Sequence, residues 1–405
     1  MPWPRVKLGD VSPSISSDRR FEPDDPVWHL TLDQIESGTG RILEKVVSPA
    51  YDAGVSSHAF DERNVLYSKL RPYLNKVLTP DEPGMATTEL VTLRPDPERL
   101  DRKFLTYYLR SDTFLQFANQ VVAGVKMPRM IMDKFWDYEI PLPPPPEQRR
   151  IVEILDQADA LRKLRREADA LAERILPALF YKMFGDPVRN EMGWETKSIG
   201  EIVTLVTSGL TPRGGEENYV KEGPYFLRSQ NIQMNGLVLD DIACLPMEIH
   251  ESMARTRVMF GDVLLNITGA SIGRVAWYDV QDHEANVNQH VCIMRLNELA
   301  KPEYVSFILS TPYGQSLISR SQTGATRQGL NHENVRGIRI PLPPTELQAE
   351  FAALVRDARM IQRNGDQASE NIESLFKTVL HRAFTGELTA RWREKNEETH
   401  TGAPQ

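Results

Sequence analysis

The 405-residue sequence contains only two cysteines, Cys244 and Cys292, and it has no run of about 18 apolar residues that could cross a membrane. Two cysteines are too few for a disulfide framework or a cysteine-based metal site, so we expect two buried free thiols. The first five residues, Met1 to Arg5, lack the apolar region of a secretory signal. The sequence therefore predicts a cytoplasmic protein with no membrane span and no disulfide.

Catalytic and cofactor-binding motifs are also missing. The segment His332-Glu333-Asn334 has no second histidine at helical spacing, so it does not match a zinc-protease site. The glycine pair at 214–215 belongs to no phosphate-loop pattern, and the acid pairs at 216–217 and 240–241 lie in polar segments where solvation is the simpler explanation. We therefore expect no catalytic residue, no metal site and no cofactor on this chain.

Net positive charge is absent as well, since the formal charge is −8. The balance is nevertheless uneven along the chain. Residues 63–80 carry four basic side chains (Arg63, Lys69, Arg71, Lys76), and residues 313–340 carry four arginines against Glu333 as the one acid. Local basic stretches permit a phosphate-binding face, although solvated surface loops explain the same charges equally simply.

What the chain does contain is an internal repeat. The segment Ile140-Pro141-Leu142-Pro143-Pro144 returns 200 positions later as Ile340-Pro341-Leu342-Pro343-Pro344. The same spacing relates Leu109 to Leu309, Gly124 to Gly324, Ala168 to Ala368 and Phe184 to Phe384. Self-similarity of this length indicates two copies of one structural unit, each with its own core.

Each copy has a first part with a mixed α/β pattern. Short apolar runs such as 64–67, 262–267 and 290–294 are typical of strands, and glycines separate them as turn residues do. A short helix is expected from Lys103 to Ala118 in the first copy and from Pro302 to Ser319 in the second, because apolar residues recur there at helical spacing.

The second part of each copy is predicted to be a long helix. Prolines suit a first helical turn, and Glu147 then faces the positive helix end. The apolar stripe that follows should pack helix against helix as an antiparallel, coiled-coil-like pair, and Pro177 should kink or break the first helix. The stripe consists of Ile151, Leu155, Ala158, Leu161, Ala168, Leu171, Ile175 and Leu179 in the first copy, and of Leu354, Ala358, Ile361, Ala368, Ile372, Leu375 and Val379 in the second.

Several segments in the mixed α/β part of each copy contain residue types that can contact the bases and phosphates of a nucleic acid. They are residues 67–76, 207–213 and 228–231, together with the glycine-centred pair 122–126 and 322–327, which occupy equivalent positions in the repeat. Arginine and lysine contact guanine, glutamine and asparagine match adenine, and glycine allows close approach to phosphate. Any one of these residues could equally belong to a solvated turn, so only the group favours DNA.

At this point the chain resembles the specificity (S) subunit of type I restriction–modification systems. The resemblance rests on the proline-rich boundary with Glu147-Gln148 and its long helix, on the segments 67–74 and 207–212, and on the helix endings Phe184-Gly185 and 383–388. It covers roughly residues 7–388. It implies two tandem target recognition domains (1–145 and 187–345), two spacer helices (146–186 and 346–388) and a flexible tail (389–405). Leu347, where the first copy has Glu147, departs from two-fold symmetry.

The resemblance implies a non-catalytic protein in which each head reads one half of a bipartite, asymmetric DNA site. The helices would set the spacing and dock two methyltransferase subunits, which motor-nuclease subunits then join. S-adenosylmethionine, ATP and magnesium would belong to those partners, since this chain lacks the tetrapeptide of an adenine methyltransferase. The helix residues expected at the partner interface are Leu161, Ala168, Ile175, Ile361, Ala368 and Leu375.

The expected length of the helices is compatible with binding to the two halves of one DNA site. Half-sites one helical turn apart are about 34–36 Å from centre to centre, and some 30–38 helical residues span roughly 45–57 Å. Two alternatives remain: a scaffold whose heads bind protein, and a tandem RNA-binding module.

The residues predicted to contact DNA are Lys69, Arg71, Lys126 and Arg129 in the first head, and Thr211, Arg213, Arg228, Gln230 and Arg327 in the second.

Overall fold

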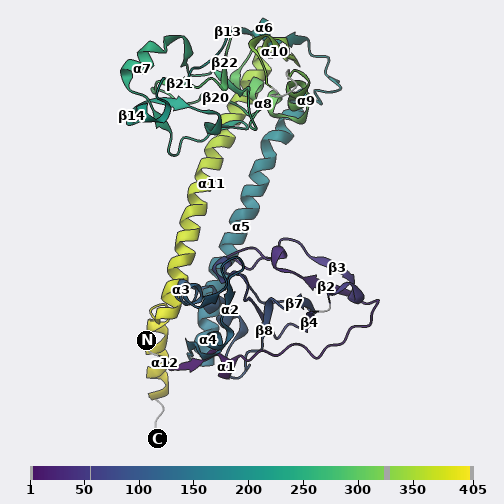
Figure 1. Cartoon of the computed structure of the whole chain (residues 1–405), viewed down its shortest axis with the longest axis vertical. Helices are drawn as coiled ribbons and strands as arrows, with labels where there is room; N and C mark the ends of the chain where they lie inside the picture. Colours follow the sequence, from purple (N-terminus) through teal and green to yellow (C-terminus); the bar gives the residue numbers. More distant parts are fainter. Residues whose placement is uncertain (1–2, 55, 323–328, 402–405) are drawn as a thin grey trace. The chain divides into compact units, whose positions relative to one another are not determined.

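The chain folds into two compact units. The computed structural model describes residues 3–54, 56–322 and 329–401, the last five of them by their backbone alone. Unit 1 is formed by Met1–Glu167 with Asp366–Gln405, and unit 2 is formed by Ala168–Gly365. Each unit therefore contains one head and a part of each long helix (Figure 1). This confirms the mixed α/β class and the duplicated plan.

Unit 1 contains two small sheets. One has the order β3 (Val46–Pro49), β2 (Pro26–Leu30), β7 (Gly84–Thr87) and β4 (Ser57–Phe60), and the other has the order β6 (Val77–Leu78), β5 (Val65–Ser68) and β8 (Leu90–Leu93). Only β2 and β7 pair in parallel within these sheets. Trp28 and Phe60 meet edge to face at 5.3 Å in the core of the first sheet.

Helices and two short strand pairs close the base of the unit 1 head. Strand β1 (Arg5–Lys7) pairs with β11 (Glu139–Pro141), and β9 (Val122–Ala123) pairs with β10 (Arg129–Met130). The helices here are α1 (Leu8–Val11), α2 (Arg102–Arg110), α3 (Asp112–Gln120) and α4 (Met132–Asp137). Tyr67, Phe114 and Phe135 pack together in the main core of this unit.

Unit 2 repeats this plan with longer strands. Its sheets have the orders β13 (Val203–Ser208), β22 (Val291–Leu296), β19 (Val263–Asn266), β20 (Val275–Trp277), and β17 (Ala243–Cys244), β14 (Val220–Leu227), β21 (Ala285–Val287), β18 (Arg257–Val258). The pairs β12 (Thr196–Ser198) with β23 (Arg339–Pro341) and β15 (Ile232–Gln233) with β16 (Gly236–Leu237) complete it. The helices are α6 (Ile199–Ile202), α7 (Met247–Ser252), α8 (Pro302–Ser310), α9 (Pro312–Arg320) and α10 (His332–Gly337).

The single short helix expected in each head is wrong, because both are broken in the middle. In unit 1 the break falls at Ser111 between α2 and α3, and in unit 2 it falls at Thr311 between α8 and α9. Both residues have extended backbone, and their hydroxyl groups accept a hydrogen bond from the amide three residues on. Serine and threonine favour this capping position, so each starts a new helix.

The repeated proline-rich segment forms the same joint in both units. Ile140 pairs with Val6 and Ile340 pairs with Lys197 across equivalent antiparallel strands, and both isoleucines are fully buried. The prolines then lead directly into α5 (Pro145–Phe184) and α11 (Thr345–Thr385). The two long helices that the sequence predicts are confirmed.

Pro177 does not interrupt α5, so the expected break is wrong. The helix continues through Pro177 to Phe184. Phe180 and Phe184 lie beyond the proline and are buried against Tyr304 and Phe351 of unit 2. This packing holds the last turns of the helix although proline cannot donate a backbone hydrogen bond there.

The apolar stripes are buried only in part. In unit 1, Ile151, Leu155 and Ala158 pack into the head. In unit 2 the predicted Leu354 is 37% exposed, and its neighbour Val355, which is not part of the predicted stripe, packs into the head instead. Five other stripe residues are 46–63% exposed, namely Leu161, Leu171, Ile175, Ile361 and Leu375. The packing of the two long helices is confirmed, but these five residues lie outside it. In unit 1, Ile151, Leu155 and Ala158 of α5 share one apolar cluster with Phe376 and Leu380 of α11. Arg162 adds a polar contact, because it binds Glu373 at 2.7 Å and lies over the Phe376 ring.

The segment predicted as a flexible tail forms a helix, α12 (Ala390–Thr401). Arg393 on this helix donates to the buried carboxylate of Glu147 at 2.6 Å, and the Thr389 hydroxyl does the same at 2.6 Å. The Trp3 indole donates to the other oxygen of Glu147 at 2.9 Å. The prediction is wrong because the residue that anchors this helix lies about 240 positions earlier in the chain.

A fully buried glutamine fixes the start of each long helix. Gln148 accepts from the Asp101 amide at 2.8 Å and donates to the Arg99 and Pro143 carbonyls. Gln348 makes the matching bonds to Lys301, Leu299 and Pro343. Three backbone groups in each unit thus depend on one side chain.

Replacing Gln148 or Gln348 by alanine is expected to destabilise the corresponding unit by about 2 kcal/mol, because buried backbone groups lose their partners. Urea unfolding of the two variants measures this loss. Gln157→Ala is the control, since Gln157 is exposed on the same helix. An unchanged unfolding midpoint for Gln148→Ala would contradict the anchoring role.

No helix in the described part of the chain is both long and apolar enough to span a membrane.

Candidate nucleic-acid interface

Three of the four predicted contact residues in the first head lie close together. The Arg71 amide donates to the Pro128 carbonyl at 2.7 Å, and the Met130 amide donates to the Lys69 carbonyl at 2.8 Å. A β-bridge also joins Leu70 to Arg129. The segment after β5 is therefore tied to the loop between β9 and β10. We call residues 69–75 and 124–129 the reading loops of unit 1; Lys126 is exposed on the second of them.

Arg71 is held in an unusual backbone conformation. Its φ and ψ are 49° and 61°, in the left-handed region that non-glycine residues rarely adopt. The turn that follows, Pro72–Leu74, ends at Asn75, which has the same conformation. The Arg71 side chain is exposed and makes no hydrogen bond or ion pair within the described residues. A strained residue that presents a free cation is a good candidate for a functional contact.

Arg129 differs from Arg71 because it already has a partner. Its guanidinium forms a bidentate ion pair with Glu89, with a shortest distance of 2.8 Å, and this bond lowers the pKa of Glu89. The Lys69 amide also donates to the Glu89 carbonyl at 3.0 Å. Glu89 therefore organises the reading loops, a role that the sequence did not indicate. Arg129 can contact a ligand directly only by sharing or leaving this carboxylate.

In unit 2, Thr211 and Arg213 lie on the loop that follows β13. The loop starts at Gly209, where an added Cβ would overlap the Val287 carbonyl, so only glycine fits. Thr211 is exposed and donates a hydrogen bond to Gln289, and Arg213 is exposed as well. These two side chains are placed where a ligand can reach them.

The other predicted residues of the second head differ in accessibility. Arg228 is only 20% exposed and is held by an ion pair to Glu216 at 3.5 Å and by the Tyr219 ring. Its placement suits an internal support of the loop better than a base contact. Gln230 is exposed on the short 3₁₀ turn Ser229–Asn231. Arg327 lies outside the described residues.

A chain of polar side chains that the sequence did not indicate runs beside this loop. Gln289 bonds to Thr211 on one side and to His290 at 3.2 Å on the other, and His290 bonds to Thr268 at 2.5 Å. His332 also reaches the Ser208 hydroxyl at 3.2 Å. The signal in the sequence is the polar run Asn288-Gln289-His290, which directly precedes a mostly apolar strand.

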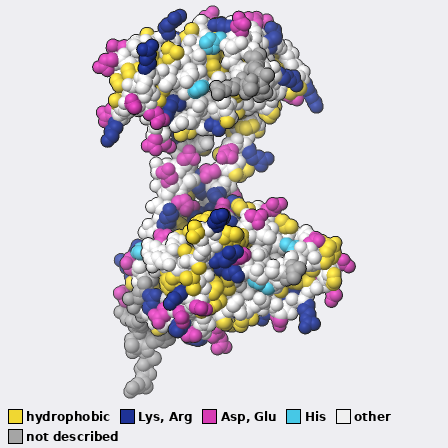
Figure 2. All heavy atoms as spheres, in the orientation of Figure 1, with side chains coloured by type: hydrophobic (Ala, Val, Ile, Leu, Met, Phe, Trp, Pro, Cys, Tyr) yellow, Lys and Arg dark blue, Asp and Glu magenta, His cyan; other side chains and the backbone are white. Residues whose placement is uncertain are grey.

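Charge of one sign does not dominate the face shown in Figure 2. Lys and Arg side chains are interspersed there with Asp and Glu. The formal charge of the chain is −8. On this face, contact with a phosphate backbone would therefore depend on small local groups of cations.

Comparison with known proteins decides the family. The model of the type I restriction modification DNA specificity domain matches twice, at residues 2–172 and 191–357. The chain belongs to this family. The two matches coincide with the two copies of the repeat, so both heads are specificity domains.

Named relatives are specificity subunits of type I restriction enzymes. The chain is 23% identical to that of EcoBI from Escherichia coli over 361 residues, which are 81% of this chain and 74% of the relative. It is 30% identical to that of EcoDI, also from Escherichia coli, over 193 residues, 45% of this chain and 41% of the relative. It is 22% identical to that of MjaVIII from Methanocaldococcus jannaschii, covering 76% and 75%.

Solved structures share the fold at low sequence identity. A chain from a structure describing complex assembly and conformational transition of the type I restriction–modification system aligns with a TM-score of 0.60 and 20% identity, covering 95% of this chain and 98% of that one. The S subunit from M. genitalium aligns with a TM-score of 0.58 and 13% identity, covering 94% and 96%.

Most residues predicted for partner docking in this specificity-domain protein are accessible. Leu161, Ala168 and Ile175 are exposed on α5, and Ile361 and Leu375 are exposed on α11. Ala368 is half-buried. Exposed apolar side chains on a long helix are available to a partner protein, so their use in docking stays a prediction.

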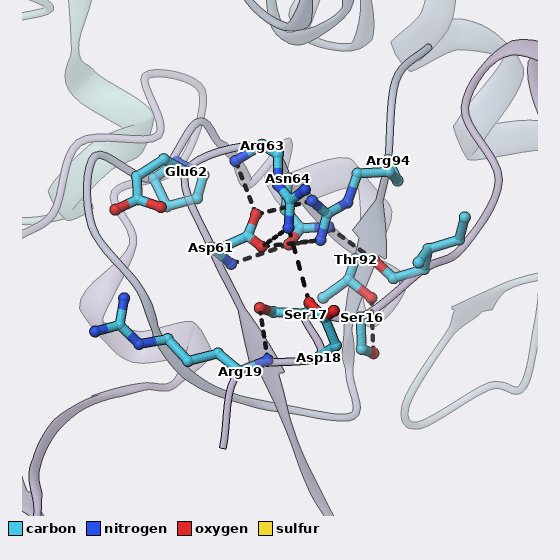
Figure 3. A network of polar contacts seen from close by, with 12 residues as sticks. Ser16, Ser17, Asp18, Arg19, Asp61, Glu62, Arg63, Asn64, Thr92 and Arg94 are labelled. Carbon is cyan, nitrogen blue, oxygen red and sulfur yellow. Dashed lines mark hydrogen bonds and ion pairs between the residues drawn. The ribbon is translucent and has the colours of Figure 1, made fainter. Parts of the chain in front are cut away.

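The specificity domain of unit 1 also contains a polar network that closes the turn between β4 and β5. Asp61 forms ion pairs with Arg63 at 2.9 Å and Arg94 at 3.0 Å, and its amide donates to Asn64 (Figure 3). In unit 2, Asp262 stands in the place of Asn64, because it accepts a hydrogen bond from the Met259 amide three residues earlier, and it pairs with Arg295. The repetition indicates a structural role in the domain rather than a contact specific to one DNA sequence.

Low pH is expected to destabilise the turn between β4 and β5. Burial alone raises the pKa of Asp61, but hydrogen bonds from Arg63, Ser17 and Arg94 outweigh it and hold the pKa below its ordinary value of 3.8. A lowered pKa in the folded state adds stability above pH 3.8, and this contribution is lost as the pH falls further. Arg94→Met is expected to raise the pKa of Asp61, which NMR titration of the carboxyl group measures. An unchanged titration would contradict the role of Arg94.

The two cysteines are suited to packing rather than chemistry. Burial raises the pKa of Cys292 to about 12 and also raises that of Cys244, so both stay protonated thiols at neutral pH. Within the described residues, no group of three or more His, Cys, Asp or Glu side chains could hold a metal ion.

Proposed function

We propose that this chain is the DNA-specificity subunit of a type I restriction–modification complex, in which each head reads one half of a bipartite site. The observation that carries the proposal is the duplicated specificity domain, whose joints are alike while the exposed loops differ. In unit 1 the reading loops present Arg71 and Lys126, and in unit 2 the loop after β13 presents Thr211 and Arg213. Different loops imply two different half-sites.

Base recognition is assigned to the exposed members of the predicted set. Arg71 and Arg213 suit guanine, for which arginine offers two parallel donors, and Gln230 suits adenine. Arg129 and Arg228 are assigned to support, because Glu89 and Glu216 already engage them. Lys69, Lys126 and Thr211 suit phosphate contacts.

The partners follow from the same proposal. Two methyltransferase subunits would dock on exposed side chains of α5 and α11, and motor-nuclease subunits would join that core. S-adenosylmethionine, ATP and magnesium would be bound by those subunits, and this chain itself would catalyse no reaction. Such a complex acts on cellular DNA, which supports a cytoplasmic location.

The test is co-expression of this chain with the methyltransferase of the same system, followed by sequencing of methylated adenines. A gapped, asymmetric motif with two specified halves is expected. Methylation without a gapped motif, or none with a competent partner, would overturn the proposal. Retention of the methyltransferase without DNA binding would indicate a scaffold, and preferential binding of RNA would indicate an RNA-binding module.

A further inference from the structure

A cavity of about 350 Å³ lies in unit 1 where the head meets α5. Its walls come from the loop around Gly40, from the end of β6, from α2 and from α5. Five of the thirteen lining residues are basic, namely Arg41, Lys103, Arg110, Lys163 and Arg166. The cavity belongs to none of the contacts assigned above.

In the described part of the chain, the acidic side chains around this cavity form ion pairs, but three of the basic side chains that line it do not. Lys103 pairs with Asp156 at 2.6 Å, Arg162 pairs with Asp159 at 3.1 Å, and Arg41 pairs with Glu36 at 2.9 Å. Within the described residues, no carboxylate lies within ion-pair distance of the remaining cations, Arg110, Lys163 and Arg166. The cavity therefore has an excess of positive charge.

Arg110 is fixed in place with part of its guanidinium unused. Its Nε and Nη2 groups donate to the Val77 carbonyl at 3.2 and 2.6 Å. An added Cβ at Gly40 would strike Nη2, so the glycine backbone covers this side of the group. Nη1 has no hydrogen-bond partner within the described residues. Burial lowers the pKa of Arg110 to about 10, which leaves it charged at neutral pH.

The walls of the cavity are hydrogen-bonded to the first reading loop of unit 1. The Asn75 side chain, at the end of the first reading loop, donates to the Arg110 carbonyl at 3.0 Å. The Gly38 amide donates to the Leu74 carbonyl at 3.2 Å, which ties the loop around Gly40 to the same turn. A strand of phosphates that passes Arg71 could therefore continue past Arg110.

Among its described residues, the second copy has no equivalent free cations at this joint. Strand pairing places Trp277 where unit 1 has Thr79, and the repeat places Arg359 where unit 1 has Asp159. Arg359 lies 3.3 Å over the Trp277 ring and pairs with Asp279 at 2.5 Å. The small Thr79 leaves space in unit 1 that the tryptophan–arginine stack occupies in unit 2.

We propose that this cavity binds a backbone phosphate of the DNA that flanks the first half-site, with Arg110, Lys163 and Arg166 as its cations. The inference rests on the proposed function and adds a sequence-independent contact to it. Phosphate suits the site because guanidinium and ammonium groups provide several donors and little apolar wall is needed. The hydrogen bonds that join the cavity walls to the first reading loop favour DNA over a free phosphate-bearing molecule.

The test is the salt dependence of DNA binding by the full chain assembled with its methyltransferase subunits. The double substitution Lys163→Ala with Arg166→Ala removes two cations of α5, of which Lys163 is exposed and Arg166 is half-buried. Each lost phosphate contact lowers the slope of log K against log salt by about 0.9, so a decrease of up to about 0.9 is expected for the one phosphate proposed here. Thr79→Trp, which fills the cavity without changing charge, should also weaken binding. Both changes should leave the methylated motif unchanged.

Arg174→Ala with Lys182→Ala is the matched control, because both side chains are exposed on α5 away from the cavity. An unchanged slope for the Lys163 and Arg166 double variant, or an equal decrease for the control, would overturn the proposal. Tight binding of inorganic pyrophosphate to the wild type with an unchanged DNA slope would also overturn it, in favour of a small-anion site. If the wild type bound no DNA, the proposed function itself would fail.

Discussion

Replacing Glu147 by leucine is expected to destabilise unit 1 by about 3 kcal/mol, because one partner of a buried ion pair is removed and the other is left. Three donors, from Trp3, Thr389 and Arg393, lose their acceptor at once. Since two of them come from the C-terminal segment, α12 should also detach. Urea unfolding measures the stability, and limited proteolysis after Leu388 measures the release of α12.

Two further variants make this prediction specific. Glu153→Leu is the control, since Glu153 is exposed on the same helix and pairs only with Arg150 in an exposed contact worth about 0–1 kcal/mol. Arg393→Met in the Glu147→Leu background should recover part of the loss, because the uncompensated cation is then gone. Equal stability of the Glu147→Leu variant and the wild type would show that the contact is not needed.

Removal of the Arg71 side chain is expected to relax one position of the first half-site and to cost about 1–3 kcal/mol of binding free energy there. The second half-site should stay specified, because its contacts come from unit 2. Sequencing of methylated adenines in cells that express each variant with the methyltransferase reads both halves at once.

The backbone of Arg71 decides which substitution is informative. Arginine and alanine both bear strain of about 1 kcal/mol at a φ of 49°, whereas glycine accepts this conformation freely. Loss of specificity in both Arg71→Gly and Arg71→Ala would assign the effect to the guanidinium. Loss in the glycine variant alone would assign it to the backbone of the turn. Arg213→Gly is the counterpart in the second head and should relax the second half-site only.

The duplicated plan and the long helices could be predicted from the sequence because both produce patterns that are visible without tertiary structure. A 200-residue repeat and a proline-rich boundary need no knowledge of tertiary contacts. The apolar stripe correctly indicated that the two helices pack together, but not which of its residues are buried. The contact of Arg162 with Phe376 and Glu373 was also not predictable, because it depends on residues over 200 positions away.

The candidate site was predictable as segments but not as individual contacts. Residue types and spacing led to Arg71 and Arg129 alike, yet the structure leaves the first free and pairs the second with Glu89. Glu89 lies on a different strand connection, so no local pattern joins it to Arg129. The breaks at Ser111 and Thr311 are different, because the Ser-Asp and Thr-Pro dipeptides were readable capping signals.

The joint between head and helix has a consequence for module exchange. Lys103 of the first head pairs with Asp156 of α5, and at the same positions of the repeat Glu303 pairs with Arg356 of α11, so the charges are reversed. A chimaera that cut at the proline-rich boundary and placed the first head on α11 would set Lys103 against Arg356. The unit that recombination can transfer without a charge clash is therefore a head together with the first four turns of its own helix.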